Sequence, residues 1–178
     1  MKALVVYESV FGNTQHIAEA VGSGLRQNFE VEIAEVGSAK PDLGGIDLIV
    51  LGGPTHAWGM SRTMTRSSAR DEAKKRGTKP VSEGIGVRDW LDRLGTSRAN
   101  IAAAAFDTAI KKTGWFPTGS AAKGEAKYLR DKGYRLIARP EQFLVKGMDG
   151  PLLDGELDRA KEWGAQLAVN AREQQRVG

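Results

Sequence analysis

A hydroxyl-rich segment at residues 9–14 follows an apolar, buried-looking run at residues 3–7, with one glutamate between them. Its members are Ser9, Val10, Phe11, Gly12, Asn13 and Thr14. The serine, asparagine and threonine offer side-chain donors, and the glycine lets the backbone approach a ligand closely. Where such a segment joins a strand to a helix, free backbone N–H groups and the helix dipole attract an anion without a cationic side chain. The segment therefore predicts a phosphate-binding loop, with simple helix capping by the hydroxyls as the alternative.

The loop lacks the signatures of the two commonest phosphate-binding loops. A Walker loop requires GxxxxGK[ST] and a dinucleotide loop requires GxGxxG, and neither pattern occurs at residues 9–14. A single phosphate of a resident cofactor fits better, because such a phosphate stays in place during turnover and needs no mobile cation.

The runs that must position these residues alternate along the chain. Strands are predicted at residues 2–7, 29–36, 46–51, 100–106 and 135–145, the last interrupted at Pro140, and helices at 14–27, 87–94, 120–132 and from about 157 onward. This alternation implies βαβ units and an α/β fold with a doubly wound five-stranded parallel sheet, covered by helices on both faces. Ligands bind beyond the carboxyl ends of the strands in such sheets. We expect one domain at residues 1–172 and a frayed tail at 173–178.

The loop at residues 9–14 resembles the phosphate loop of the flavodoxin family. That family's [ST]-x-[ST]-G-x-[ST] pattern maps onto Ser9, Phe11, Gly12 and Thr14, and Phe11 departs from the usual hydroxyl residue. The departure removes one phosphate contact, although the Phe11 N–H remains. The resemblance implies the flavodoxin-like strand order 2-1-3-4-5 and FMN as the cofactor, because one terminal phosphate would be held and no adenosine-binding fingerprint occurs.

A second segment, after the apolar run at 46–51, is similar to the GxPT loop with which flavodoxins wrap one face of the flavin. The residues assigned to it are Pro54, Thr55, His56, Ala57, Trp58 and Gly59. The resemblance makes Trp58 a candidate to stack on the flavin ring and His56 the competing candidate. Gly59 offers a backbone that can reorient beside the ring. The alternative is that Trp58 covers the core and the proline is part of an ordinary turn.

The segment after the fourth strand borders the other side of the flavin in that family. The resemblance places Phe106, Asp107 and Thr108 there, with backbone N–H groups meeting the pyrimidine edge of the ring. Trp115 or Phe116 is expected either to cover the outer face of the ring or simply to pack on the surface.

Composition excludes several other functions. The chain has no cysteine, which excludes disulfides, thiolate metal sites and the nucleophile of a low-molecular-weight phosphatase. A receiver domain would need an aspartate where glycines and Pro54 end the third strand. No apolar run reaches the length of a signal peptide or a membrane span, so a cytoplasmic protein without a membrane partner is expected.

Positive charge is concentrated in a polar insert at about residues 61–85. Between residues 61 and 80, seven basic side chains stand against two acidic ones, while the rest of the chain is almost neutral. One local patch does not indicate nucleic-acid binding. We expect Arg62, Arg66 and Arg70, which recur every four residues, to dock an acidic redox partner protein or the phosphates of NAD(P)H. A solvated flexible insert is the alternative.

The sequence contains no evident set of catalytic side chains and no metal site, so the chemistry would be that of the flavin. The favoured interpretation is an electron-transfer flavoprotein. The second is an FMN-dependent NAD(P)H or quinone oxidoreductase, in which the insert and the third segment would wall a substrate pocket. The third is a flavodoxin-like module that has lost flavin and serves interaction only. The oligomeric state stays open.

Overall fold

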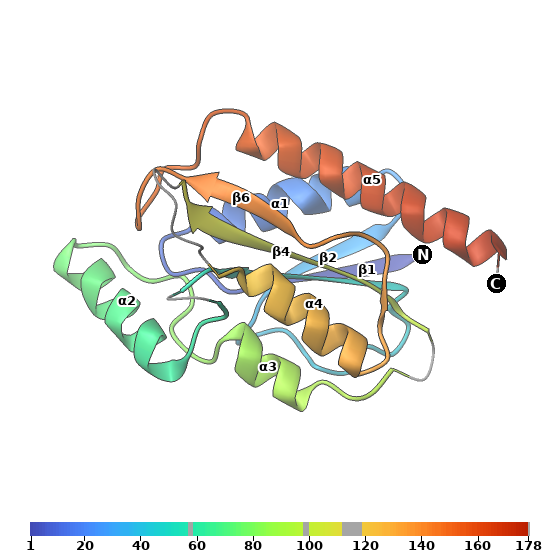
Figure 1. Ribbon diagram of the computed structural model, residues 1–178, viewed down its shortest axis with the longest axis horizontal. Coiled ribbons are helices and arrows are strands. Elements are labelled where there is room, and N and C mark those ends of the chain that lie inside the picture. Colours follow the sequence, from blue (N-terminus) through green and yellow to red (C-terminus); the bar gives the residue numbers. More distant parts are fainter. Residues whose placement is uncertain (57–58, 98–99, 112–118, 178) are drawn as a thin grey trace.

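The computed structural model describes residues 1–56, 59–97, 100–111 and 119–177. In chain order the described elements are β1 (Lys2–Tyr7), α1 (Asn13–Leu25), β2 (Glu30–Glu35), β3 (Leu48–Pro54), α2 (Thr63–Lys75), α3 (Val87–Arg93), β4 (Ala102–Ile110), α4 (Ala121–Asp131), β5 (Arg135–Leu136), β6 (Glu141–Val145) and α5 (Glu156–Val177). A central sheet lies between two helix layers, and α2 lies outside both layers (Figure 1).

The sheet is parallel throughout and has the order β2-β1-β3-β4-β5, as the sequence predicts. β1 lies inside the sheet, where Val5 pairs with Ile33 on one side and Val50 on the other. Its residues 3–7 are therefore all buried. β5 and β6 pair with successive parts of β4, so they form one interrupted edge. Pro140 lies between them, where its missing N–H removes a ladder hydrogen bond.

Two helices cover each face of the sheet. α1 and α5 pack on one face around a cluster that includes Ile17, Phe106 and Leu167. α3 and α4 pack on the other, where Trp90 and Leu129 are fully buried. α1 and α5 lie so close that a Cβ at Gly24 would meet the Lys161 carbonyl oxygen at 2.1 Å, and one at Gly164 would meet the Val21 carbonyl oxygen at 2.2 Å. Glycine at both positions is therefore a condition of this packing.

The structure extends one predicted strand and describes the insert and the tail. β4 runs to Ile110 instead of ending at Phe106, because the polar side chains inside it find partners, as described below. The polar insert contains a regular helix, α2. The tail expected to fray is helical as far as Val177.

Helix α2 lies at the end of the sheet toward which the β4 and β6 arrows point (Figure 1). That end holds the carboxyl termini of all the parallel strands, where a doubly wound sheet binds its ligands. Within the described parts of the chain, no helix is both long and apolar enough to cross a bilayer.

Candidate functional site

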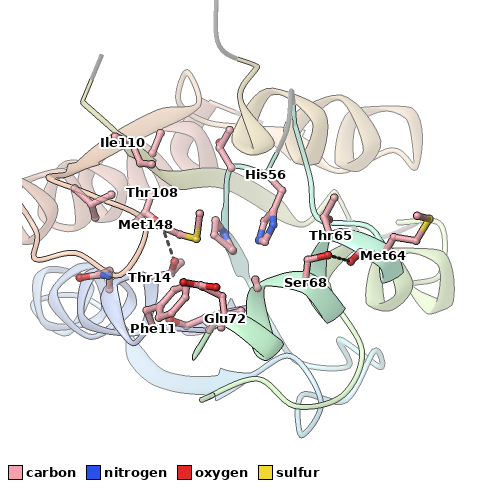
Figure 2. A pocket seen from close by; sticks show the side chains of 18 residues that line it. Phe11, Thr14, His56, Met64, Thr65, Ser68, Glu72, Thr108, Ile110 and Met148 are labelled. Carbon is pink, nitrogen blue, oxygen red and sulfur yellow. Dashed lines mark hydrogen bonds between the residues drawn. The ribbon is translucent and has the colours of Figure 1, made fainter. Parts of the chain in front are cut away.

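A pocket of about 660 Å³ opens at the carboxyl ends of β1, β3 and β4, against one side of α2 (Figure 2). Its volume lies within the range typical of small-molecule sites. The described residues that line it are Ser9, Val10, Phe11, Asn13, Thr14, Pro54, Thr55, His56, Met64, Thr65, Ser68, Ala69, Glu72, Thr108, Ala109, Ile110, Val145 and Met148. The pocket therefore joins the first two predicted loops and adds a wall that the sequence interpretation missed.

The loop after β1 leaves the first N–H groups of α1 uncapped. Gly12 is the N-cap residue, with φ = 88°, a left-handed conformation in which a side chain is strained. Its N–H donates to the Ser9 hydroxyl at 3.0 Å. The hydroxyls of Thr14 and Thr108 share a hydrogen bond of 2.7 Å, drawn in Figure 2. In the described structure no side chain caps α1, so the capping alternative is wrong and the helix N-terminus is open to an anion.

A two-residue strap fixes the start of this loop from the outside. The N–H groups of Val81 and Ser82 donate to the carbonyl oxygens of Val10 and Ser9, at 3.1 and 2.7 Å. The Ser9 N–H donates in return to the Ser82 hydroxyl at 2.9 Å. These bonds join residues more than seventy positions apart, and no local sequence pattern predicts them.

Helix α2 packs on the same loop through a small apolar cluster. Ala69 and Ala73, one turn apart, are buried with Val10, and Phe11 packs against the three. Phe11 is therefore the contact by which the loop binds the inserted helix, at the position where the family pattern has a hydroxyl. The four-residue spacing of the two alanines was the available signal for the buried face of α2.

Hydrogen bonds fix the described residues of the second predicted loop beside the pocket. The Thr55 N–H donates to the Thr108 carbonyl oxygen at 2.9 Å, and the Thr55 hydroxyl accepts from the Ala121 N–H at 3.0 Å, which ties the loop to β4 and α4. His56 and Gly59 exchange backbone hydrogen bonds of 2.9 and 2.7 Å. Pro54, Thr55 and His56 line the pocket, whereas Gly59 does not. The predictions for Ala57 and Trp58 lie outside the described residues.

The third predicted segment is corrected by the greater length of β4. Phe106 is fully buried in the core against Phe143 and Trp163, so it does not reach the pocket. Asp107 points to the start of α4, where it accepts from the Ser120 hydroxyl at 2.6 Å and the Ala122 N–H at 3.0 Å. Of the three, only Thr108 lines the pocket. The prediction for Trp115 lies outside the described residues.

The basic row of the insert is divided by the structure. The Arg66 side chain is only 6% exposed and forms an ion pair with Asp89, which fixes α2 to the first turn of α3. Arg70 donates to the carbonyl oxygens of Glu83 and Gly84 and faces a second, polar hollow with Lys74, on the flank of α2 away from the site pocket. Arg62 is exposed. The three arginines predicted to form one docking patch therefore do not lie together on one free face.

A surface ion pair joins α2 to the loop after β6. The Arg76 guanidinium contacts Glu72 at 2.9 Å and Asp149 at 2.7 Å, and the paired carboxylates raise its pKa. Glu72 and Met148 both line the pocket, so this pair connects two of its walls.

Titratable groups near the site have shifted pKa values. Burial, together with nearby Arg66, lowers the pKa of His56, which keeps its imidazole neutral at neutral pH. Burial raises the pKa of Glu8, although its carboxylate accepts from the Ser61 hydroxyl at 2.7 Å and the Val87 N–H at 2.9 Å. Burial and the nearby carboxyls of Asp107 and Glu8 raise the pKa of Glu125 well above its ordinary value. No trio of His, Asp or Glu side chains among the described residues is arranged to hold a metal ion.

Comparison with known proteins gives the same fold. Residues 4–74 match the family model described as a flavodoxin domain. A flavodoxin from the domain Archaea has 24% sequence identity and a TM-score of 0.66, over 97% of this chain and 99% of that one. Flavodoxin 2 from Bacillus cereus has 22% identity and a TM-score of 0.63, over 98% and 99% of the two chains. A search of curated protein sequences gives no match.

The same fold also occurs as part of a larger protein. The Flv1 flavodiiron core from Synechocystis sp. PCC6803 has 16% identity and a TM-score of 0.64, over 98% of this chain but only 36% of that one. At these identities the likeness to solved structures concerns the fold.

Proposed function

The chain is flavodoxin-like, in the family match of its N-terminal part and in its fold, and from that premise we propose that it binds FMN and transfers electrons. The observation that carries the proposal is the uncapped N-terminus of α1, which opens into the pocket at the point where the strand order reverses between β1 and β3. An anion bound there meets backbone N–H groups and the positive end of a helix of 13 residues.

The residues present fit the parts of FMN. The phosphate would be held by N–H groups at residues 10–15 other than that of Gly12, which donates to Ser9, and by the Thr14 hydroxyl. The apolar side chains of Pro54, Val145 and Ile110 line the pocket and suit a ring system. The polar groups of Thr55 and Thr108 are fixed by hydrogen bonds and would orient it. When bound, FMN supplies the redox chemistry, and the protein's part is to hold and orient it.

The chain's own residues perform the positioning. Gly12, in a left-handed conformation, turns the backbone from the loop into α1 and leaves the helix start without a side-chain cap. The strap at Val81 and Ser82 fixes the start of the loop, and the Thr14–Thr108 bond ties α1 to β4. The neutral imidazole of His56 would add no charge beside a bound ring.

The first experiment is a titration of the purified protein with FMN, followed by flavin absorbance and fluorescence. We expect one FMN per chain. A protein that stays colourless and leaves flavin fluorescence unchanged at saturating FMN would contradict both redox functions and favour a flavin-free interaction module.

A second experiment tests the phosphate loop itself. Replacing Thr14→Val removes one hydroxyl from the loop, and we expect FMN affinity to fall about tenfold, the usual cost of a hydrogen bond to a charged group. Riboflavin, which lacks the phosphate, should bind both proteins equally. Thr96→Val, in the exposed segment after α3, is the matched control. Equal losses for FMN and riboflavin would place the phosphate elsewhere.

A further inference from the structure

The mouth of the pocket carries an apolar rim from three elements. Met64 near the start of α2, Ile110 at the end of β4 and Met148 in the loop after β6 are 82%, 48% and 55% exposed. All three also line the pocket. Figure 2 shows Met64 on one side of it and Ile110 and Met148 on the other. Exposed large apolar side chains that gather round one opening mark a binding surface more often than scattered ones do.

The rim is bordered by cations. Lys111 follows Ile110, and Lys146 precedes the Met148 turn. The two lysines continue paired strands, because Ile110 is in register with Val145 and the Lys111 N–H donates to the Val145 carbonyl oxygen at 2.9 Å. Both are exposed, as is Arg62 at the start of α2. Among the residues that the structure describes, none of these three has an ion-pair partner.

The acidic groups beside the rim are partly neutralised, because two carboxylates share one guanidinium. Glu72 and Asp149 both contact the Arg76 guanidinium. The rim therefore presents apolar side chains within a positive border, and neighbouring lysines at the ends of paired strands repel each other unless an anionic group lies between them.

We propose that this rim, Met64, Ile110 and Met148 with Lys111, Lys146 and Arg62, is the docking surface for an acidic redox partner protein. The proposal rests on the proposed electron-transfer function and replaces the α2 patch expected from the sequence. A small ligand inside the pocket would leave the solvent-facing parts of the rim bare, above all Met64. A protein surface can cover all of them, and methionine side chains adapt readily to a partner.

The test uses an acidic [2Fe–2S] ferredoxin as the probe and cytochrome c, which is basic, as the probe of opposite charge. Each is titrated into the FMN-loaded, ¹⁵N-labelled protein, and the dissociation constant is measured at low and high salt. We expect the ferredoxin to shift the amide resonances around residues 64, 110–111 and 146–148, with binding that weakens as salt rises. Cytochrome c should leave them unchanged.

The decisive variant is Lys111→Glu/Lys146→Glu, which reverses the border without touching a pocket-lining residue. We expect ferredoxin binding to weaken about tenfold or more. Arg26→Glu/Lys161→Glu is the matched control, because it reverses two exposed cations, one directly after α1 and one on α5, the helices on one face of the sheet. The control should bind ferredoxin within about twofold of the parent protein, as surface charges distant from an interface do.

The contribution of the apolar rim to docking is tested with Met64→Glu. The control is Val169→Glu, at an exposed apolar position on α5. Binding is measured on the FMN-loaded fraction, and only the first change should weaken it. Shifts that map elsewhere, or equal effects of the two lysine and arginine doubles, overturn the proposal. So does a soluble benzoquinone that shifts the rim while ferredoxin does not. A chain that binds no FMN contradicts the proposed function instead, and ferredoxin titrated into that chain still tests the docking surface.

Discussion

The loop at residues 9–14 and helix α2 pack against each other, but they are held in place in opposite ways. The turn into α1 takes its shape from the loop's own residues, since Gly12 turns the backbone and donates to Ser9 three positions earlier, and only the start of the loop is fixed by the distant Val81 and Ser82. Helix α2 is placed by partners far along the chain: Arg66 pairs with Asp89, and Arg76 pairs with Asp149. The types of neighbouring residues thus predict the turn of the loop. The position of α2 and the surface that it offers depend on which side of the helix each arginine faces.

The largest loss of stability is expected for a change at Arg66, which fixes α2 to α3. Replacing Arg66→Ala leaves the Asp89 carboxylate without its partner next to buried Glu8, and we expect a loss of about 2–3 kcal/mol in the free energy of unfolding. Asp89 is partly exposed, which places the loss at the lower end for broken buried pairs. Urea unfolding measures it, with exposed Arg62→Ala as the control, expected to change stability by less than about 0.5 kcal/mol. Equal costs for the two would mean that long-range pairing does not place α2.

A smaller loss of stability is expected at Phe11, where the loop at residues 9–14 packs on α2. Phe11→Ser restores the hydroxyl of the family pattern but removes the packing on Ala69 and Ala73. Because Phe11 is half-buried, we expect stability to fall by about 1–2 kcal/mol, with no gain in FMN affinity. Phe11→Leu, which keeps an apolar contact, should lose less. A tighter FMN complex in the serine variant would show that the site chemistry, and not the helix contact, determines this position.

The pH dependence of stability should come from groups around the loop and not from the loop itself, because residues 9–14 contain no ionisable side chain. Buried Glu125 keeps in the folded chain a proton that the unfolded chain releases above about pH 4.5, so it lowers stability as pH rises toward its raised pKa. We expect Glu125→Gln to flatten this decline, which is at most about 1.4 kcal/mol per pH unit for one proton. Chemical denaturation at several pH values measures it. Parallel curves for the two proteins would refute a proton held at Glu125.

The smallest effect is expected for the exposed pair that joins α2 to the loop after β6. Arg76→Ala should leave the free energy of unfolding nearly unchanged, because exposed ion pairs contribute little and are screened by salt. We expect FMN to dissociate faster, since Glu72 and Met148, which the pair connects, are both walls of the pocket. Stopped-flow release of FMN at two salt concentrations checks this. A rate unchanged at low salt would show that the pair does not retain the cofactor.

Much of the fold follows from the sequence because the buried strands are continuous apolar runs. The runs at residues 2–7 and 46–51 predict β1 and most of β3, and the break at Pro140 predicts the divided edge of the sheet. The end of β4 was wrong because Asp107 and Thr108 look like loop residues. They remain in the strand since α4 and Thr14 supply their hydrogen bonds, and no local pattern reveals those partners.

The candidate site, like the fold, was predicted where neighbouring residues determine it and missed where distant parts of the chain do. The first loop was predicted from its glycine and hydroxyls after a strand, and the Pro54–His56 segment from its resemblance to the GxPT loop of flavodoxins, and both line the pocket. The wall from α2 was missed, since its regular arginine spacing concealed that Arg66 points inward. The far rim was missed because Ile110 and Met148 reach the pocket only through the pairing of β4 with β6.

The hydrogen bonds at Ser61 and Ser82 have a consequence for how the insert is carried. Ser61 donates to Glu8, and Ser82 bonds to Ser9, so both ends of the intervening chain are fastened to consecutive residues at the end of β1. The twenty residues from 62 to 81 leave the sheet and return to nearly the same point, so the pairing of the strands does not depend on how long this segment is. Exchanging residues 62–81 for a short turn or for another helix would alter the wall of the site and leave the register of the strands intact, because closing a loop between neighbouring points depends only weakly on its length.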